Sequence, residues 1–146
     1  MKPEDIARVR TTWALVVPIA DTAVELFYQR LFALDPGLRL MFRSSDWTTQ
    51  RSKLVHALNL VVASLNEVDE IDPTLQALGS RHAAYGVQDP HYDMVGQALI
   101  ATLEEGSGDA WTPETATEWN EAYDIVASIM RRAQVQARAI PVVATT

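Results

Sequence analysis

The sequence predicts an all-α domain of about seven helices, some of them very short. Apolar residues recur at intervals of three and four positions along most of the chain, which is the period of a helix with one buried face. Five of the seven prolines stand where a helix would begin, and a proline in the first position loses no helical hydrogen bond. No alternating apolar pattern indicates a strand, and no internal repeat is visible. Together these observations predict helices alone.

Five of the expected helices have a start signal at a proline. Pro3 precedes two acidic residues, which favour a helix N-terminus. The other four starts are prolines that each follow a residue suited to N-capping: Pro36 after Asp35, Pro73 after Asp72, Pro90 after Asp89 and Pro113 after Thr112. We expect the helix that starts at Pro90 to end at Gly106, because glycine often terminates helices.

Four apolar stripes are expected to line one core. Those of the first half are Val24, Phe27, Tyr28 and Leu31, and then Leu54, Leu58, Val61, Val62 and Leu65. Those of the second half are Val95, Ala98, Leu99 and Leu103, and then Trp119, Ala122, Tyr123, Val126, Ile129, Met130 and Ala133. We expect residues 1–138 to form one domain. Residues 139–146 contain a proline and β-branched residues without a helical pattern, so we expect a disordered tail there.

Composition narrows the possible functions. The chain has 146 residues, 48% of them hydrophobic and 21% charged, as in an ordinary globular domain. Its formal net charge of -7 argues against nucleic acid as a partner. The first ten residues lack the apolar stretch of a signal peptide, and Pro18 interrupts the longest early apolar run, so we expect a cytoplasmic protein without a membrane span. The lack of cysteine excludes disulfides and thiolate metal sites.

The three histidines are the remaining candidates for metal chemistry. They are not spaced as a metal site built only from protein ligands would require. His82 follows Leu75 and Leu78 at helical intervals, so its imidazole faces the core from a short helix. Such a histidine is either a hydrogen-bonded core residue or a metal ligand, and one histidine suffices where a macrocycle supplies the other ligands, as in haem proteins. His56 and His91 are expected at the surface.

Seven short segments of the chain resemble, in order and in spacing, the bacterial single-domain haemoglobins and the globin domain of flavohaemoglobins. They read LFYQRLF at 26–32, DP at 35–36, MF at 41–42, QRSKL at 50–54, RHAAYGV at 81–87, HYDMVG at 91–96 and WNEAY at 119–123. The resemblance covers residues 13–132. It implies a globin fold around a haem pocket, with haem b (iron protoporphyrin) as the cofactor.

The resemblance also implies roles for individual residues. His82 corresponds to the proximal iron ligand, and Phe42 corresponds to the aromatic residue that stacks on the haem. Tyr28 and Gln50 correspond to the distal pair that donates hydrogen bonds to a bound ligand, and Leu54 corresponds to the apolar wall beside that ligand. From the residues alone, Phe42, Tyr28 and Leu54 are ordinary core residues.

Further residues are implied to surround the cofactor. Leu78, Val87 and Val95 correspond to apolar pocket positions. Lys53 and Arg81 either reach the haem propionates, since cations suit carboxylates, or are solvated.

On the proximal side, Tyr92 corresponds to the partner of the second ring nitrogen of His82. In flavohaemoglobins the matching tyrosine pairs with a glutamate of the last helix, whereas this sequence has Gln134 there. Because a neutral amide cannot supply a carboxylate's charge, we expect less electron density to be pushed toward the iron, and weaker peroxidase-like or dioxygenase chemistry.

The leading functional hypothesis is a protein that reversibly binds dioxygen for storage, transport or scavenging, and that also accepts carbon monoxide or nitric oxide. Two distal hydrogen-bond donors predict high oxygen affinity and slow release. The rival hypothesis is a nitric oxide dioxygenase, which would need a separate reductase because no flavin or nicotinamide module is visible. A haem-based gas sensor is a third class, and it would normally need an output domain. A monomer or a homodimer is expected.

Overall fold

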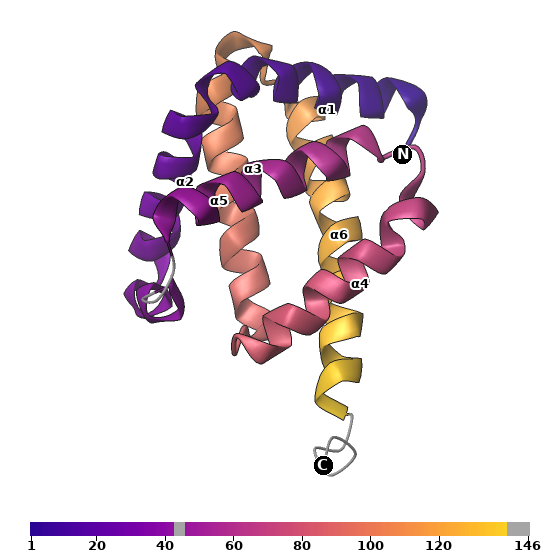
Figure 1. The fold of residues 1–146 in the computed structure, drawn as a ribbon. Helices are drawn as coiled ribbons and strands as arrows, with labels where there is room; N and C mark the ends of the chain where they lie inside the picture. Colours follow the sequence, from indigo (N-terminus) through magenta and orange to yellow (C-terminus); the bar gives the residue numbers. More distant parts are fainter. Residues whose placement is uncertain (43–45, 140–146) are drawn as a thin grey trace.

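The computed structural model describes residues 1–42 and 46–139 (Figure 1). Within these ranges the chain forms six α-helices and no strand, which confirms the predicted all-α class. The α-helices are α1 (Pro3–Val16), α2 (Ala20–Leu34), α3 (Trp47–Ala63), α4 (Val68–Ala84), α5 (Asp89–Ser107) and α6 (Pro113–Ala139). Three 3₁₀ segments, η1 (Val17–Ile19), η2 (Pro36–Phe42) and η3 (Gly108–Ala110), account for the expectation of additional short helices. Most of the expected tail, residues 140–146, lies outside the described residues.

Three of the proline signals mark the starts of elements as expected. Pro3, Pro36 and Pro113 are the first residues of α1, η2 and α6. Pro90 is the second residue of α5, whose N-cap is Gln88.

The prediction at Pro73 is wrong, because this proline lies inside α4, which begins at Val68. Ile71 and Leu75 are both buried, so their packing holds the helix on either side of the proline. The loss of one backbone donor near the first turns is offset by this burial. The end of α5 at Ser107 also lies one residue beyond the predicted Gly106.

The six helices are arranged as two crossed sets. In Figure 1, α5 and α6 run side by side, α1 crosses one end of them, and α3 and α4 cross in front. The main packing partners are α4 with α6 and α2 with α5, while α1 contacts both α5 and α6. Helix α3 packs against α1 and α2. The two front helices are therefore held by different neighbours.

The core consists of two apolar clusters that meet in the middle of the molecule. The larger cluster joins α1, α2, α5 and the start of α6, and its fully buried side chains include Val9, Val16 and Leu103. The smaller joins α4, the start of α5 and the middle of α6. Val61 of α3 and Tyr123 of α6 are only partly buried, and they contact both clusters.

A close helix crossing fixes the position of α4. A Cβ atom placed on Gly79 would lie 2.5 Å from the backbone oxygen of Met130 in α6. Only glycine leaves room for such an approach between two backbones. The crossing lies less than one turn before His82, so it also sets where that side chain emerges.

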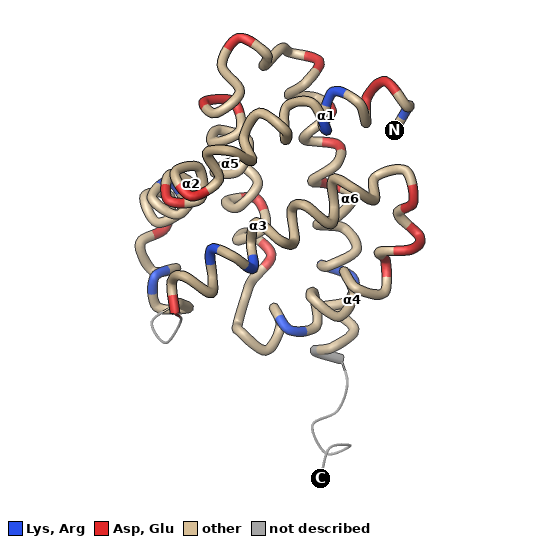
Figure 2. The backbone as a smooth tube through the Cα atoms, turned by 45° about the horizontal axis from the view of Figure 1, so that its top comes forward, with Lys and Arg blue, Asp and Glu red and all other residues tan. Residues whose placement is uncertain are grey.

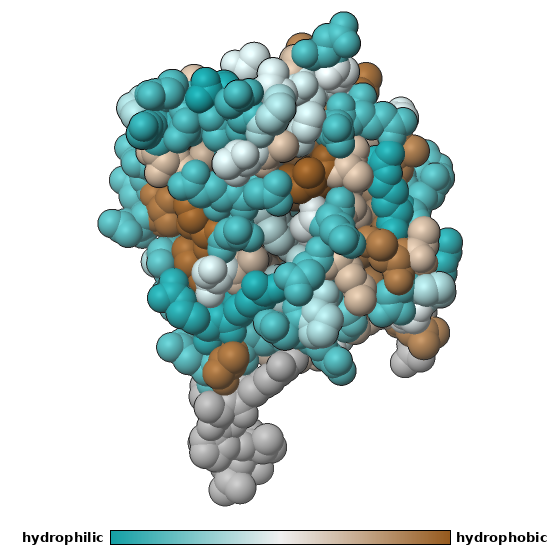
Figure 3. All heavy atoms as spheres, turned by 180° about the vertical axis from the view of Figure 1, so that it is seen from behind, coloured by the Kyte–Doolittle hydropathy of each residue, from teal (hydrophilic) through white to brown (hydrophobic). Residues whose placement is uncertain are grey.

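The surface is largely polar. The face shown in Figure 3 is mostly hydrophilic, with apolar side chains confined to separate small patches. In the two described ranges, no helix combines the length and the hydropathy that crossing a bilayer would need.

Candidate haem-binding site

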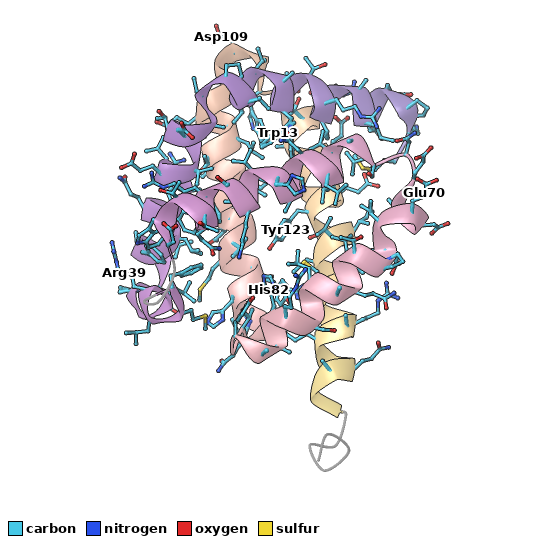
Figure 4. The ribbon with its side chains drawn as sticks, in the orientation of Figure 1. Trp13, Arg39, Glu70, His82, Asp109 and Tyr123 are labelled. Carbon is cyan, nitrogen blue, oxygen red and sulfur yellow. The ribbon has the colours of Figure 1, made fainter. Side chains whose placement is uncertain are left out.

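His82 projects from α4 toward the region between α4 and α3 (Figure 4). It is half-buried, and its Nδ1 atom lies 2.8 Å from the backbone oxygen of Leu78, one turn earlier. Because a carbonyl can only accept, Nδ1 carries the proton and Nε2 keeps its lone pair. Burial is the main cause that lowers the pKa of His82, which favours the neutral form that binds metals. The helix that carries it has 17 residues, longer than the short helix expected.

The ring-nitrogen partner predicted for His82 was Tyr92, and here the prediction is corrected. Nδ1 contacts Leu78 instead, while Tyr92 lies with its ring centroid 6.5 Å from that of His82 at an interplanar angle of 25°. The buried Tyr92 hydroxyl donates to Gln134 of α6, and the Gln134 amide donates to the backbone oxygen of Val87. The structure thus brings Gln134 to Tyr92 in the register that the sequence indicated.

Tyr28 and Gln50 come together from two different helices. Tyr28 is buried on α2 and Gln50 is half-buried on α3, and the Gln50 amide is near enough to act on the Tyr28 phenol. Burial raises the pKa of Tyr28, and the neighbouring Gln50 amide and the charge of Arg51 oppose this increase without cancelling it. The phenol therefore keeps its proton well above neutral pH and remains a donor. Leu54, one turn after Gln50, is half-buried against the larger core cluster.

An aromatic cluster surrounds Tyr28 at the start of α3. The ring of Phe42 lies 5.6 Å from that of Tyr28, and the ring of Trp47 lies 5.3 Å from it, both edge-on. Phe42 and Trp47 stack on each other at 5.9 Å. Sequence reasoning missed Trp47, although a tryptophan five residues after Phe42, at the start of the helix that carries Gln50, was an available signal.

The remaining predicted residues differ in burial. Leu78, Val87 and Val95 are half-buried and contact the core clusters. Lys53 and Arg81 are exposed, on α3 and α4 respectively. Figure 2 shows basic segments in the first half of α3 and the second half of α4.

The two histidines expected at the surface have no place in this site. His56 is exposed. His91 is half-buried, and its Nδ1 atom accepts the backbone N–H of Gln88 at the start of α5.

The apolar residues between α3 and α4 are less covered than a fully packed core would make them. Of the 17 residues of α3, only Val62 is buried. Phe42, Leu54, Leu58, Leu78 and Val95 all remain half-buried. A flat apolar group would cover this surface, and the free Nε2 of His82 would supply an axial metal ligand. These residues therefore fit a haem, with donors from Tyr28 and Gln50 for a ligand.

The helical fold brings one half-buried histidine together with half-buried apolar side chains that fit a macrocycle. The sequence pattern of the globin family matches residues 25–130. The chain belongs to the globin family, and membership in that family implies haem binding.

Individual relatives agree with this assignment. The flavohemoprotein of Bacillus subtilis is 28% identical over 121 residues, which cover 82% of this chain and 30% of the relative. This chain thus spans about a third of the length of such relatives. An anaerobic nitrite reductase of Gossypium hirsutum is 30% identical over 138 residues, covering 84% of this chain and 87% of the relative.

Solved structures support the fold. A protein of Pseudomonas aeruginosa PAO1, described as structurally highly homologous to a human hemoglobin, superimposes with a TM-score of 0.79 at 23% identity. The superposition covers 88% of this chain and 97% of that one. The neuroglobin of the marine acoel Symsagittifera roscoffensis gives a TM-score of 0.77 at 17% identity, covering 89% and 97%.

Proposed function

We propose that this protein is a haem globin that reversibly binds dioxygen, with His82 as the proximal ligand of haem b. Bound haem would supply an iron that accepts a diatomic ligand on the side away from His82. The observation that carries the proposal is that Tyr28 of α2 and Gln50 of α3 lie near each other, while His82 comes from α4.

The distal pair sets the strength of binding. A bound ligand that carries partial negative charge is stabilised by the Tyr28 hydroxyl and the Gln50 amide, because both can donate hydrogen bonds. Each such bond contributes roughly 1.5 to 3 kcal/mol, and about 1.4 kcal/mol changes affinity tenfold. The protein therefore binds oxygen tightly and releases it slowly.

The cofactor assignment is tested first, by visible absorption spectroscopy. The purified protein supplied with haem is expected to show haem bands that shift under oxygen and under carbon monoxide. His82→Ala is expected to change these spectra. A parent protein that stays colourless would overturn the proposal.

The distal assignment is tested by stopped-flow measurement of oxygen release. Tyr28→Phe is expected to raise the dissociation rate at least about tenfold, the equivalent of one hydrogen bond of about 1.4 kcal/mol. Tyr85→Phe is the matched control, because it removes a phenol hydroxyl from a side chain that is 62% exposed. Equal rates in the parent and in Tyr28→Phe would rule out this role for Tyr28.

A nitric oxide dioxygenase is the second candidate. The flavohemoprotein relatives favour it, together with the Tyr28 and Gln50 donors. The Gln134 amide beside Tyr92 argues for weaker electron donation toward the haem than a carboxylate would give. Nitric oxide consumption is measured with reductant and a separate flavoprotein reductase: a single stoichiometric burst favours the oxygen binder, and sustained turnover favours the enzyme.

Two further features complete the proposal. Lys53 and Arg81, exposed on α3 and α4, would pair with the haem propionates at the rim of the pocket. Replacing each with methionine is expected to speed haem loss to an acceptor protein if the contacts form.

We also propose a cytoplasmic monomer or homodimer, which sedimentation and cell fractionation would test.

A further inference from the structure

Arg131 of α6 lies over the ring of Tyr92, the aromatic residue beside His82. The central carbon of its guanidinium is 5.1 Å from the centroid of the Tyr92 ring. Tyr92 is buried, and its ring centroid lies 6.5 Å from that of His82 at an interplanar angle of 25°. A planar guanidinium is attracted to the face of an aromatic ring by its charge and by its shape. The three side chains therefore form a series that runs from α6 through α5 to α4.

Two aspartates of α5 hold Arg131 in this place. Its Nη2 atom donates to Asp93 Oδ1 at 2.9 Å, and its Nε atom lies 3.0 Å from Asp89 Oδ1. Both carboxylates are mostly exposed, and exposed ion pairs add little stability by themselves. Their effect is geometric, because Asp89 lies three residues before Tyr92 and Asp93 directly follows it. The guanidinium is thus anchored to the same turns of α5 that carry the ring.

The two ends of Tyr92 are fixed by other residues. Its hydroxyl donates to Gln134, which lies three residues after Arg131 on the same face of α6. Its backbone oxygen accepts from the Tyr123 hydroxyl at 2.6 Å. Neither contact stops the ring from turning about the line that joins its two ends. A guanidinium over the face of the ring does stop this rotation.

The orientation of His82 depends in turn on the Tyr92 ring. The Leu78 carbonyl holds the Nδ1 atom of His82 at 2.8 Å, which leaves the imidazole able to tilt about that contact. The nearly parallel ring of Tyr92 limits the tilt. The ring of Tyr85 also lies near His82, at 6.0 Å, but Tyr85 is 62% exposed and gives weaker support. Residues that orient a metal-binding imidazole tune its bond to the metal.

We propose that Arg131 is a positioning residue for the proximal histidine: by covering the Tyr92 ring, it holds the His82 imidazole in one orientation toward the iron. This inference deepens the proposed haem function and rests on it. Arg131 acts through Tyr92 and is not itself a ligand of the iron.

The test is resonance Raman spectroscopy of the ferrous, ligand-free holoprotein, which reports the stretching vibration of the bond between iron and histidine. The parent protein is expected to give one band. Arg131→Met keeps a long side chain but removes the charge and the planar group, so it is expected to shift or broaden this band. Arg131→Lys is expected to have an effect of the same kind, because lysine keeps the charge but lacks the planar group.

Two control variants separate positioning from loss of charge and loss of stability. Arg132→Met removes the same charge at the next position of α6, where Arg132 is exposed and donates to the backbone oxygen of Ser128 in its own helix. Trp119→Phe lowers stability elsewhere, at the hydrogen bond between Trp119 and Thr12. Both variants are expected to leave the iron–histidine band unchanged.

Double variants show whether Arg131 acts through the Tyr92 ring. Tyr92→Leu is expected to alter the band by itself, and adding Arg131→Met to it should change nothing further. Tyr92→Phe keeps the ring, so adding Arg131→Met to that variant should still alter the band. If Tyr92→Leu does not fold, as judged by circular dichroism, the comparison with Tyr92→Phe decides.

The inference is overturned if Arg131→Met leaves the band at the position and width of the parent. It is also overturned if Trp119→Phe produces the same change, since lower stability would then suffice, or if Arg131→Met acts equally with and without the Tyr92 ring. Loss of the Arg131 effect in Tyr92→Phe overturns it as well. Failure of the proposed function is a distinct outcome, since the parent would then show no haem bands in the visible spectrum, and this inference would fall with it.

Discussion

Gly79→Ala tests whether the crossing of α4 and α6 fixes the proximal side of the site. The added Cβ would lie 2.5 Å from the Met130 backbone oxygen and 2.8 Å from Met130 Cα. Since ordinary carbon contacts begin at about 3.5 Å, and since these are backbone atoms that cannot rotate away, α4 must move by roughly 1 Å. Overpacking of this kind costs about 1 to 3 kcal/mol, while alanine returns up to about 1 kcal/mol of helix propensity.

We therefore expect Gly79→Ala to be destabilised by about 1 to 2 kcal/mol, which corresponds to a lower melting temperature by roughly 3 to 8 °C. Thermal and urea unfolding followed by circular dichroism measure this change. Haem loss should also become faster, because His82 follows on the same helix. Ser80→Ala, at the next position of α4, is the control and should be neutral or slightly stabilising. A Gly79→Ala protein as stable as the parent would show that α4 is not held at this crossing.

Three other predictions concern the core, the distal helix and pH. Trp119→Phe removes the hydrogen bond of 2.7 Å from Trp119 Nε1 to the buried Thr12 hydroxyl. Urea unfolding should show that the free energy of unfolding falls by about 1 to 3 kcal/mol. The double variant with Thr12→Val should recover part of this loss. Asp46→Ala removes the N-cap side chain of α3, which accepts a hydrogen bond from the backbone N–H of Thr48. The free energy of unfolding should fall by about 1 kcal/mol, and amide exchange should become faster in the first turn of α3. Unchanged exchange would contradict this prediction. Burial raises the pKa of Tyr28, and Gln50 does not titrate, so the oxygen dissociation rate should vary less than about twofold between about pH 6 and pH 9. A larger change of this rate with pH in that range would show that another group controls ligand release.

The sequence predicted the helices well where the signal was local. The N-cap and proline pair at Thr112 and Pro113 starts α6, and the Thr112 hydroxyl accepts from the backbone N–H of Thr115. The same kind of pair misled at Pro73, because Ile71 and Leu75 pack on the core and carry the helix through the proline. A capping signal describes a preference of one turn, and burial of neighbouring residues can outweigh it.

The site was predicted less completely, because its parts meet only in three dimensions. The resemblance gave Tyr28, Gln50 and His82, and the structure places the first two near each other. It did not give the Leu78 carbonyl as the partner of His82, since that contact depends on the side-chain rotamer. Trp47 could have been noticed from its spacing after Phe42, but its contact with the Tyr28 ring depends on another element and appears only in the structure.

The two sides of the proposed haem site differ in how firmly they are held, and this difference has consequences for the proposed function. On the proximal side, α6 holds its neighbours at several points: Met130 against Gly79, Gln134 against Tyr92, and the Tyr123 hydroxyl donating at 2.6 Å to the Tyr92 backbone oxygen. On the distal side, α3 has one buried residue and packs only against α1 and α2 among its main partners. A helix with few buried contacts moves at lower cost than one fixed by backbone crossings. Substitutions on α6 should therefore act on haem retention, whereas substitutions on α3 should act on the rates at which ligands enter and leave.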